Sequence, residues 1–469
     1  MLLNAQCRPG APLGAKALVL AVAAALFSLA SPGVAAAATT PAGNLQLSVT
    51  PKVSAADTPL TISVSGLRPG AQVALTVTSV DAAGVKWRST STYAASSAGT
   101  VDPATSKGLD SYTGIDPMGP VDFMSPGAPG TPGPTSGLYP TWPFGLSSAW
   151  GPLYSWAKCS LSLQGQSGCS WSKPLSFRFT ATSGQAHASV TVQRSPAVPV
   201  SATVETVAAT GFDGVFWQPP ADQDNHVGIL EFYDSPGVNT PLGAFLAARG
   251  YPTLDLDYFD QPGLSNPPQG LTLEYFAKAL SWLGAQPGVN SKDLWVMGLG
   301  VGSEAALLLG ADYPDLVHGV AALSPHDVAD CSLSYEFGWP RVTSFIWTLG
   351  GQPVPCTTQG GPQPTDNPAA VIPVAKVQGP LFADCGGADN SSSWNSCPNG
   401  EQIMTELASA NDRYPHELLQ YPHAGYLLGA LLPYYPGFDD CGCFAGTTDV
   451  SNSRARAAQW PKLLAFLRN

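Results

Sequence analysis

The stretch from Leu294 to Leu309, LWVMGLGVGSEAALLL, decides the fold. Leu294–Met297 is a short apolar run of the kind that forms a buried strand, and Ser303–Leu309 is rich in strong helix formers. Three glycines, Gly298, Gly300 and Gly302, separate the two runs at alternate positions. The stretch therefore predicts a strand that turns sharply on glycine into a helix, the βα unit from which parallel sheets are built.

Similar units flank this stretch on both sides. Apolar runs that predict strands alternate with amphipathic runs that predict helices, which is typical of repeated βαβ units and a parallel sheet. We assign residues 206–469 to an α/β-hydrolase domain, a mainly parallel sheet with flanking helices. The predicted strands are 227–232, 253–256, 294–297, 320–323 and 380–382, and the predicted helices are 241–248, 272–283, 303–309 and 459–467.

The region from 45 to 194 has a different pattern. Apolar residues alternate with polar ones at Leu60, Ile62 and Val64 and again at 73–77, with turn residues between them. Period-two alternation with frequent turns is typical of a β-sandwich, so an all-β sandwich domain precedes the hydrolase domain. A Pro/Gly/Trp-rich insertion at 125–171 interrupts it, and we assign 195–205 to a linker.

The first 38 residues have the pattern of a signal peptide. Arg8 and Lys16 precede the apolar run 17–30, and the alanines at 35–38 offer small-residue cleavage sites. A transmembrane anchor is the alternative, but this run is shorter than the roughly 20 residues that a spanning helix needs. We therefore expect a secreted, extracellular protein with no transmembrane anchor in the mature chain.

Cysteine usage agrees with export. Of nine cysteines, only Cys7 lies in the predicted leader, and an even number in an exported chain suggests disulfides. Proximity in the sequence favours the pairs Cys159–Cys169, Cys331–Cys356 and Cys385–Cys397.

Cys441 and Cys443 leave an alternative open, in which they bind zinc together with His416 or His423. Their spacing, C-x-C, is outside the C-x₂₋₄-C range of structural zinc sites, so we predict no metal and no cofactor.

Composition excludes other classes of protein. The net charge is −12, with 21 Lys and Arg against 33 Asp and Glu, and no basic run is present, which argues against a nucleic-acid partner. Gly and Pro make up about a fifth of the chain, but 44% of the residues are apolar, so the sequence predicts a folded, loop-rich protein and no disordered polymer.

Several short motifs carry a resemblance to a known family. The motifs are Asp57-Thr58-Pro59-Leu60, Gly66-Leu67-Arg68-Pro69-Gly70, Asp116-Pro117-Met118-Gly119, Asp257-Tyr258-Phe259 and Leu273-Glu274-Tyr275-Phe276. With these motifs the chain resembles the acyl-CoA thioesterase / bile acid-CoA:amino acid N-acyltransferase family over nearly all its mature length. The resemblance implies a β-sandwich joined to an α/β-hydrolase domain, and chemistry on acyl thioesters through a nucleophile–histidine–aspartate triad.

The resemblance also places the catalytic positions, and most of them hold unexpected residues. The nucleophile turn has the pattern G-x-S-x-G, and Gly300 stands where the family has serine or cysteine. Tyr426 stands where the family has histidine, whereas Asp389 matches the triad acid. In the oxyanion loop, Asp234 would repel a developing negative charge and Pro236 has no N–H to donate.

Other residues near these positions could carry activity. Ser303 is either a displaced nucleophile or, as we favour, a capping or packing serine in the first helical turn. His423 is either a substitute base or, as we favour, a solvent-facing loop histidine. Ser324, His326 and Asp327 follow a predicted strand and should lie at the functional edge of the sheet.

The function that these residues favour is therefore binding without catalysis. We expect a member of the family that binds an acyl chain, a lipid or a protein partner in a cleft near Gly300, which includes Tyr233, Asp234, Ser303 and His326. The alternative is an active ester or thioester hydrolase with a relocated nucleophile.

Overall fold

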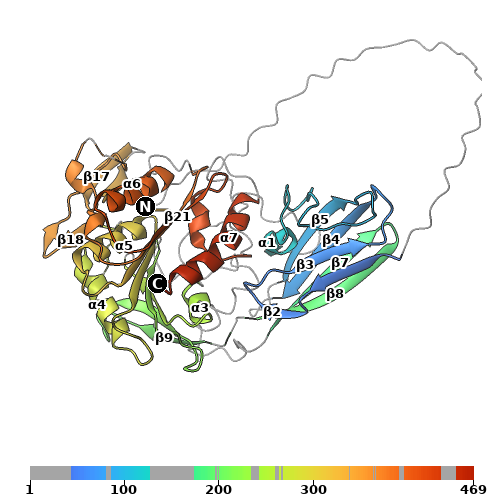
Figure 1. The fold of residues 1–469 in the computed structure, drawn as a ribbon, viewed down its shortest axis with the longest axis horizontal. Coiled ribbons are helices and arrows are strands. Elements are labelled where there is room, and N and C mark those ends of the chain that lie inside the picture. The colour runs from blue at the N-terminus through green and yellow to red at the C-terminus, as the bar shows by residue number, and fades with distance from the viewer. Residues whose placement is uncertain are drawn as a thin grey trace, which may run out of the picture.

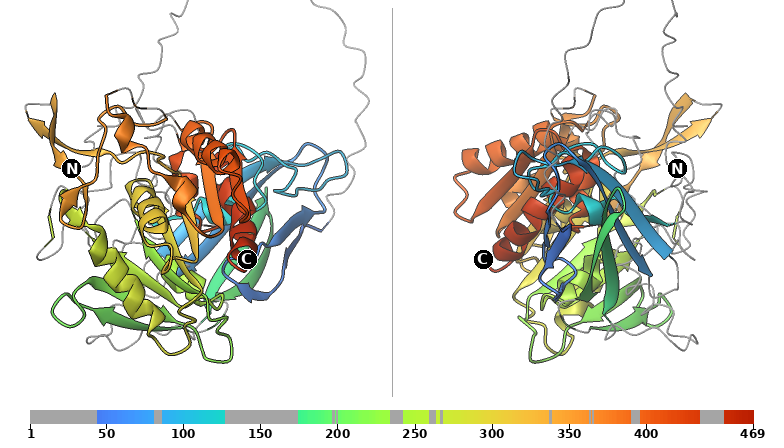
Figure 2. Two further views of the ribbon diagram at one scale, coloured as in Figure 1. Left: turned by 60° about the vertical axis from the view of Figure 1, so that its left-hand side comes forward. Right: turned by 90° about the vertical axis from the view of Figure 1, so that its right-hand side faces the viewer.

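The computed structural model describes most of the chain in two β-containing domains that lie side by side (Figures 1 and 2). The predicted signal peptide and disulfide Cys159–Cys169 lie outside the described residues, as do Asp234, Cys441, Cys443 and all but the first two residues of the 125–171 insertion. The described residues are 44–80, 86–126, 174–195, 198, 200–233, 242–258, 264–265, 268–336, 339–362, 364, 366–389, 396–434 and 450–469.

The amino-terminal domain consists of a six-stranded sheet in the order β2-β8-β7-β4-β5-β6 and a two-stranded sheet of β1 and β3. Alternate residues of β4, including Val73, Leu75 and Val77, are buried, as the period-two pattern predicts. The strands are β1 (Gln46–Thr50), β2 (Val53–Ala55), β3 (Thr61–Ser65), β4 (Gln72–Val80), β5 (Lys86–Ala94), β6 (Ser125–Pro126), β7 (Leu175–Ser183) and β8 (Ala186–Ser195), with the short helix α1 (Gly119–Asp122).

The carboxy-terminal domain is built on an eight-stranded mixed sheet in the order β21-β20-β15-β14-β11-β12-β10-β9. The six strands from β21 to β12 are parallel, and β10 runs antiparallel to both of its neighbours. The central strands are buried on both faces, which explains their continuous apolar sequences. The strands are β9 (Ser201–Glu205), β10 (Asp213–Gln218), β11 (Gly228–Phe232), β12 (Thr253–Asp257), β14 (Leu294–Leu299), β15 (Gly319–Leu323), β20 (Leu381–Gly386) and β21 (His416–Tyr421).

Helices cover both faces of this sheet, which confirms the α/β-hydrolase class. Apolar residues of α4 (Leu273–Gly284), α5 (Val301–Asp312) and α6 (Ser396–Ser409) share one core on one face. Residues of α3 (Leu242–Ala247) and α7 (Ser451–Phe466) belong to a second core, which continues into the amino-terminal domain (Figure 1). The remaining elements are β13 (Leu271–Thr272), β16 (Cys331–Glu336), β17 (Trp339–Phe345), β18 (Trp347–Leu349), β19 (Gln352–Pro353), η2 (Pro368–Ala370), η3 (Val374–Lys376) and η4 (Tyr426–Ala430).

Several features of this domain, including β10 and β16–β19, differ from the sequence prediction. The predicted linker 195–205 contains β9, which pairs with β10 at the edge of the sheet. The last helix begins at Ser451 rather than at 459, and α6 and β21 were not predicted. These elements have many polar residues and weak apolar periodicity, so tertiary packing rather than local pattern stabilises them.

Acidic residues of two amino-terminal motifs join the domains. Asp57 is 2% exposed on its side chain, forms an ion pair with Arg249, and accepts a hydrogen bond from Trp460 Nε1 at 2.8 Å. Asp116 accepts a hydrogen bond from Ser453 Oγ at 2.7 Å. Because the shared core also crosses this seam, the two domains are packed as one unit.

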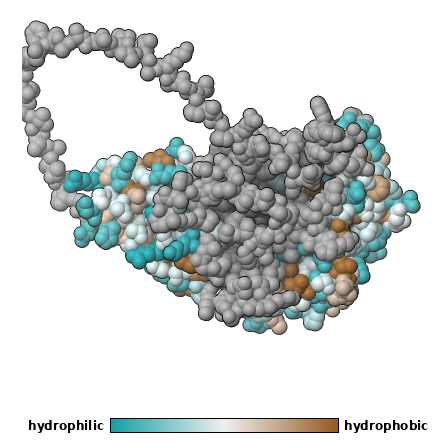
Figure 3. Space-filling model, turned by 180° about the vertical axis from the view of Figure 1, so that it is seen from behind, coloured by the Kyte–Doolittle hydropathy of each residue, from teal (hydrophilic) through white to brown (hydrophobic). Residues whose placement is uncertain are grey.

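Figure 3 shows one face of the molecule. Among the described residues visible on that face, hydrophobic ones form small, separate patches between more hydrophilic ones. Within the described ranges, no helix combines the length and the apolar character that crossing a bilayer requires.

Candidate functional site

The turn between β14 and α5 has the geometry of a nucleophile elbow. Gly300 has φ 56° and ψ −119°, a conformation that glycine adopts at little cost and other residues adopt only under strain. Its N–H donates to the Leu323 carbonyl oxygen at 3.0 Å, which fixes the turn against the end of β15. A glycine at this position therefore stabilises the turn but supplies no reactive atom.

The flanking glycines allow the close packing of this turn. A Cβ on Gly298 would collide with the carbonyl oxygen of Gly302. A Cβ on Gly302 would lie 2.9 Å from the Phe232 carbonyl oxygen and 3.4 Å from that of Tyr233. Tyr233, at the end of β11, is therefore beside the turn, as the sequence predicts. Its carbonyl oxygen also accepts a hydrogen bond from Tyr258 Oη at 2.6 Å.

Ser303 is buried and its hydroxyl is fully engaged. Oγ donates to the Gly300 carbonyl oxygen at 2.6 Å and accepts from the His326 N–H at 3.0 Å. These bonds fit a serine that fixes the first turn of α5 against the neighbouring loop, which was the favoured interpretation.

The loop that carries Tyr426 packs directly on this turn. Tyr426 begins η4, and its carbonyl oxygen accepts a hydrogen bond from Ser324 Oγ at 2.9 Å. A Cβ on Gly429 of the same 3₁₀ helix would collide with the Leu299 side chain. His423, three residues earlier, is exposed to solvent, as favoured from the sequence.

Asp389 lies in the neighbouring loop, after β20. Its carboxylate is buried and accepts a hydrogen bond from Ser396 Oγ at 2.9 Å. Two backbone hydrogen bonds, from Gly387 to Tyr421 at 2.9 Å and from Ala388 to Ala424 at 3.0 Å, join this loop to the one that carries Tyr426. The structure thus brings the loops of Gly300, Asp389 and Tyr426 together at the carboxyl edge of the sheet.

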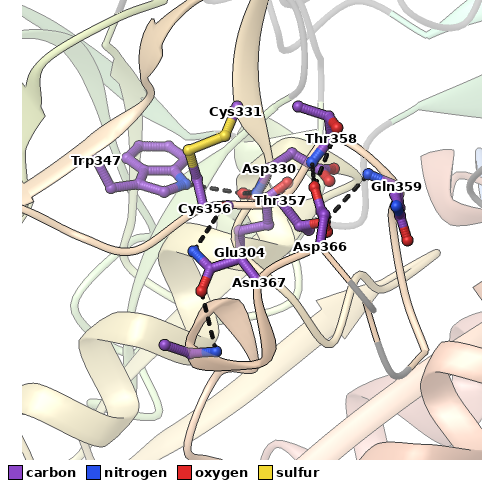
Figure 4. The surroundings of a disulfide bond; sticks show 11 residues. Glu304, Asp330, Cys331, Trp347, Cys356, Thr357, Thr358, Gln359, Asp366 and Asn367 are labelled. Carbon is purple, nitrogen blue, oxygen red and sulfur yellow. Dashed lines mark hydrogen bonds between the residues drawn. A yellow bond between two sulfur atoms is a disulfide. The ribbon is translucent and has the colours of Figure 1, made fainter.

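Two of the predicted disulfides are confirmed. Cys385–Cys397 ties the end of β20 to the start of α6, on either side of the Asp389 loop. Cys331–Cys356 ties β16 to a following loop in which Asp366 and Asn367 are hydrogen bonded to their neighbours (Figure 4).

Ser324, His326 and Asp327 do not converge on one site. The Ser324 N–H donates to Asp384 Oδ1 at 2.8 Å, whereas the His326 ring points at Glu304 and Asp330. Within the described part of the chain, neither carboxylate oxygen of Asp327 has a hydrogen-bond partner.

The structure adds two buried acidic residues, Asp384 and Glu304, to the candidates from the sequence. Burial raises the pKa of Asp384 to about 7, opposed by the hydrogen bond from Ser324. Burial and then Asp330 raise the pKa of Glu304. Burial lowers the pKa of His326, but the neighbouring carboxylates of Asp330 and Glu304 outweigh burial, so that the net shift is upward. The one signal in the sequence was Glu304, an acidic residue in the first turn of a helix that continues with the apolar run 305–309.

A hollow of about 370 Å³ lies away from this site. It is lined by Leu308 and Asp312 near the end of α5, together with residues from 349–355 and 369–373. Gly300 precedes the other end of the same helix. The predicted ligand cleft near Gly300 is a separate place and stays a prediction.

Comparisons with known proteins agree with the family resemblance that the sequence motifs carry. Residues 57–138 match the "Acyl-CoA thioester hydrolase/BAAT N-terminal region" and residues 271–469 match the "BAAT / Acyl-CoA thioester hydrolase C terminal". The chain is 26% identical over 447 residues to acyl-coenzyme A amino acid N-acyltransferase 2 of Rattus norvegicus, covering 90% of this chain and 97% of the relative. It is 24% identical over 429 residues to acyl-coenzyme A thioesterase 6 of Mus musculus, covering 88% of this chain and 93% of the relative.

A solved α/β hydrolase from a Medee basin deep-sea metagenome library is similar to 58% of this chain and 99% of its own length. Its TM-score is 0.35 at 16% identity.

Proposed function

The chain belongs to the acyl-CoA thioester hydrolase/BAAT family, and on that premise we propose that it is a non-catalytic member that binds an acyl chain or a lipid. The observation that carries the proposal is Gly300. Covalent acyl transfer needs an oxygen or sulfur nucleophile at the elbow, and glycine has neither. Glycine adopts the backbone conformation at Gly300 without strain, so the turn keeps its shape although it lacks a reactive side chain.

The other catalytic positions support the same proposal. Tyr426 replaces the histidine base, and a phenol is a poor general base near neutral pH. Asp389 is present at the acid position, but its carboxylate accepts a hydrogen bond from Ser396, an interaction that stabilises the loop. Asp234, in the oxyanion loop, would oppose negative charge on a tetrahedral intermediate.

We propose that the protein is exported, and this location limits the ligands that it can meet. The amino-terminal 38 residues have the pattern of a signal peptide, and two disulfides suit an oxidising compartment. An exported protein would not meet the cytoplasmic pool of acyl-CoA. We therefore propose that the ligand is a free acyl chain, an ester or a lipid, held near Gly300, Tyr233 and Tyr426.

An active hydrolase with a relocated nucleophile is the second candidate, because Ser324 has an unusual backbone. Its φ is 42°, and non-glycine residues with positive φ at strand ends are often functional. Against this candidate, its hydroxyl donates to the Tyr426 carbonyl oxygen rather than to a base. No histidine within the described residues is hydrogen bonded to it.

Acyl binding and turnover can be measured on the same protein. The purified mature chain should bind a fluorescent fatty acid saturably and release no thiol from palmitoyl-CoA above the buffer rate. Tyr426→Asp, which puts a charge beside the expected acyl site, should weaken binding at least tenfold. Tyr414→Asp, at the opposite end of β21, is the matched control and should leave binding unchanged.

Each contrary result has a distinct meaning. Lack of saturable binding to fatty acid and to lipid vesicles would refute the ligand and leave a protein partner as the remaining candidate. Turnover that Ser324→Ala abolishes would instead establish the relocated nucleophile.

A further inference from the structure

A cluster of three metal-ligating side chains is buried one helical turn beyond the elbow. Glu304 comes from α5, and His326 and Asp330 come from the loop between β15 and β16. His326 Nδ1 lies 2.9 Å from Glu304 Oε1 and 3.0 Å from Asp330 Oδ2. All three residues are at most 3% exposed. A nitrogen and two carboxylate oxygens therefore converge on one point inside the protein.

The second oxygen of Glu304 is held by donors outside the cluster. Glu304 Oε2 accepts hydrogen bonds from Trp347 Nε1 at 2.8 Å and from the Asp330 N–H at 3.0 Å (Figure 4). These bonds fix the carboxylate and turn Oε1 toward His326. Outer donors that orient a ligating carboxylate in this way are typical of metal sites.

Hydrogen bonds within the cluster do not satisfy all of its buried polar atoms. Nδ1 carries at most one proton, and its contact with Glu304 Oε1 is the one that has hydrogen-bond geometry. Asp330 Oδ2 points at the same nitrogen but has no hydrogen-bond partner within the residues that the structure describes. With both carboxyl groups ionised, two carboxylates and one imidazolium would also leave a net charge of about −1 in a buried site, which is costly.

We propose that Glu304 Oε1, His326 Nδ1 and Asp330 Oδ2 bind one divalent first-row metal ion. With bonds of about 2.1 Å, ligand atoms 2.9 and 3.0 Å apart subtend about 90°, the angle between neighbouring octahedral ligands, whereas a tetrahedral site needs about 3.4 Å. The ion replaces the Nδ1 proton, binds Asp330 Oδ2, which accepts no hydrogen bond from the described residues, and makes the buried charge zero. Mixed imidazole and carboxylate ligands suit Mn²⁺, Fe²⁺ or Zn²⁺.

The site is structural. Ser303 bonds to both the elbow and the His326 N–H, and Cys331, next to Asp330, is in a disulfide. An ion here would hold the loop after β15 against α5 and so stabilise the elbow from behind. This role is independent of acyl binding.

Metal binding can be tested on the full mature chain. Metal-free protein should bind Mn²⁺ and Zn²⁺ with a stoichiometry of about one in calorimetric titration, and its Tm should rise by several degrees. Glu304→Gln and Asp330→Asn should each weaken binding at least tenfold. Asp312→Asn, a carboxylate at the far end of the same helix, should have no effect on binding.

A spectroscopic readout keeps the proposal testable if the variants fail to fold. Electron spin-echo spectra of wild-type protein with Mn²⁺ should show coupling to one imidazole nitrogen. Absence of binding at millimolar metal, of that coupling, or of any difference between Asp330→Asn and Asp312→Asn would overturn the proposal.

Discussion

Replacing Gly300 by serine gives the elbow the residue type that an active enzyme carries there, and it should make the protein less stable. The backbone at Gly300, φ 56° and ψ −119°, costs a non-glycine residue roughly 1–3 kcal/mol. Serine also has less conformational freedom than glycine in the unfolded chain, which stabilises the folded state by about 0.5 kcal/mol. We therefore expect the free energy of unfolding to fall by roughly 0.5–2.5 kcal/mol, measured as a lower midpoint in urea.

Gly184→Ser is the matched control. Gly184 has φ +58°, and no atom lies within 4 Å of a Cβ built there, so this variant reports the cost of positive φ alone. Gly300→Ser should cost at least as much. A variant as stable as wild type would refute the elbow conformation that we assign to Gly300.

The same variant should not hydrolyse acyl-CoA. Triad members act as a unit, and in our proposal Tyr426 holds the position of the histidine base, so that serine at 300 would have no imidazole to activate it. Substantial turnover from this single change would show that another base is present and that our assignment of the base position is wrong.

Three further predictions concern other parts of the protein. Asp57→Ala removes one of the two acidic residues that join the domains, and should lower the free energy of unfolding by roughly 2–4 kcal/mol in urea. The exposed control Asp110→Ala should change it by less than about 0.5 kcal/mol. Burial raises the pKa of Asp384 to about 7, so the folded state holds its proton more tightly than the unfolded state, and stability falls as pH rises from about 4 to 7. Asp384→Asn should remove this dependence and gain stability relative to wild type over that range, and a parallel pH dependence of the two proteins would refute it. Removal of Cys385–Cys397 by paired alanines should cost about 3 kcal/mol, and alkylation before reduction should leave both cysteines unmodified in wild type; free thiols there would contradict the disulfide.

The central βα units and the elbow could be predicted because their signals are local. Apolar runs such as 294–297 and 320–323 are long enough to define buried strands, and the glycines between β14 and α5 mark the turn. The two disulfides within the described residues were also predictable, since each closes a short stretch of chain.

The buried cluster behind the elbow could not be predicted. Glu304, His326 and Asp330 come from two separate elements, and only the packing of the loop after β15 on α5 brings them together. The sequence placed His326 in the ligand cleft, whereas the structure turns its ring toward Glu304 and Asp330. The edge strand β9 was assigned to a linker because its pairing with β10 carries no local signal.

Covalent labelling tests directly whether the chain lacks a reactive serine nucleophile, on which the non-catalytic proposal depends. The wild-type mature chain is incubated with a fluorophosphonate probe, which modifies activated serines, and its intact mass is compared with that of an untreated sample. An active serine esterase treated in parallel confirms that the probe is reactive. We expect an unchanged mass, because Gly300 offers no nucleophile and the hydroxyls of Ser303 and Ser324 are hydrogen bonded to carbonyl oxygens. Addition of one probe to a single serine, together with turnover of p-nitrophenyl esters, would contradict it.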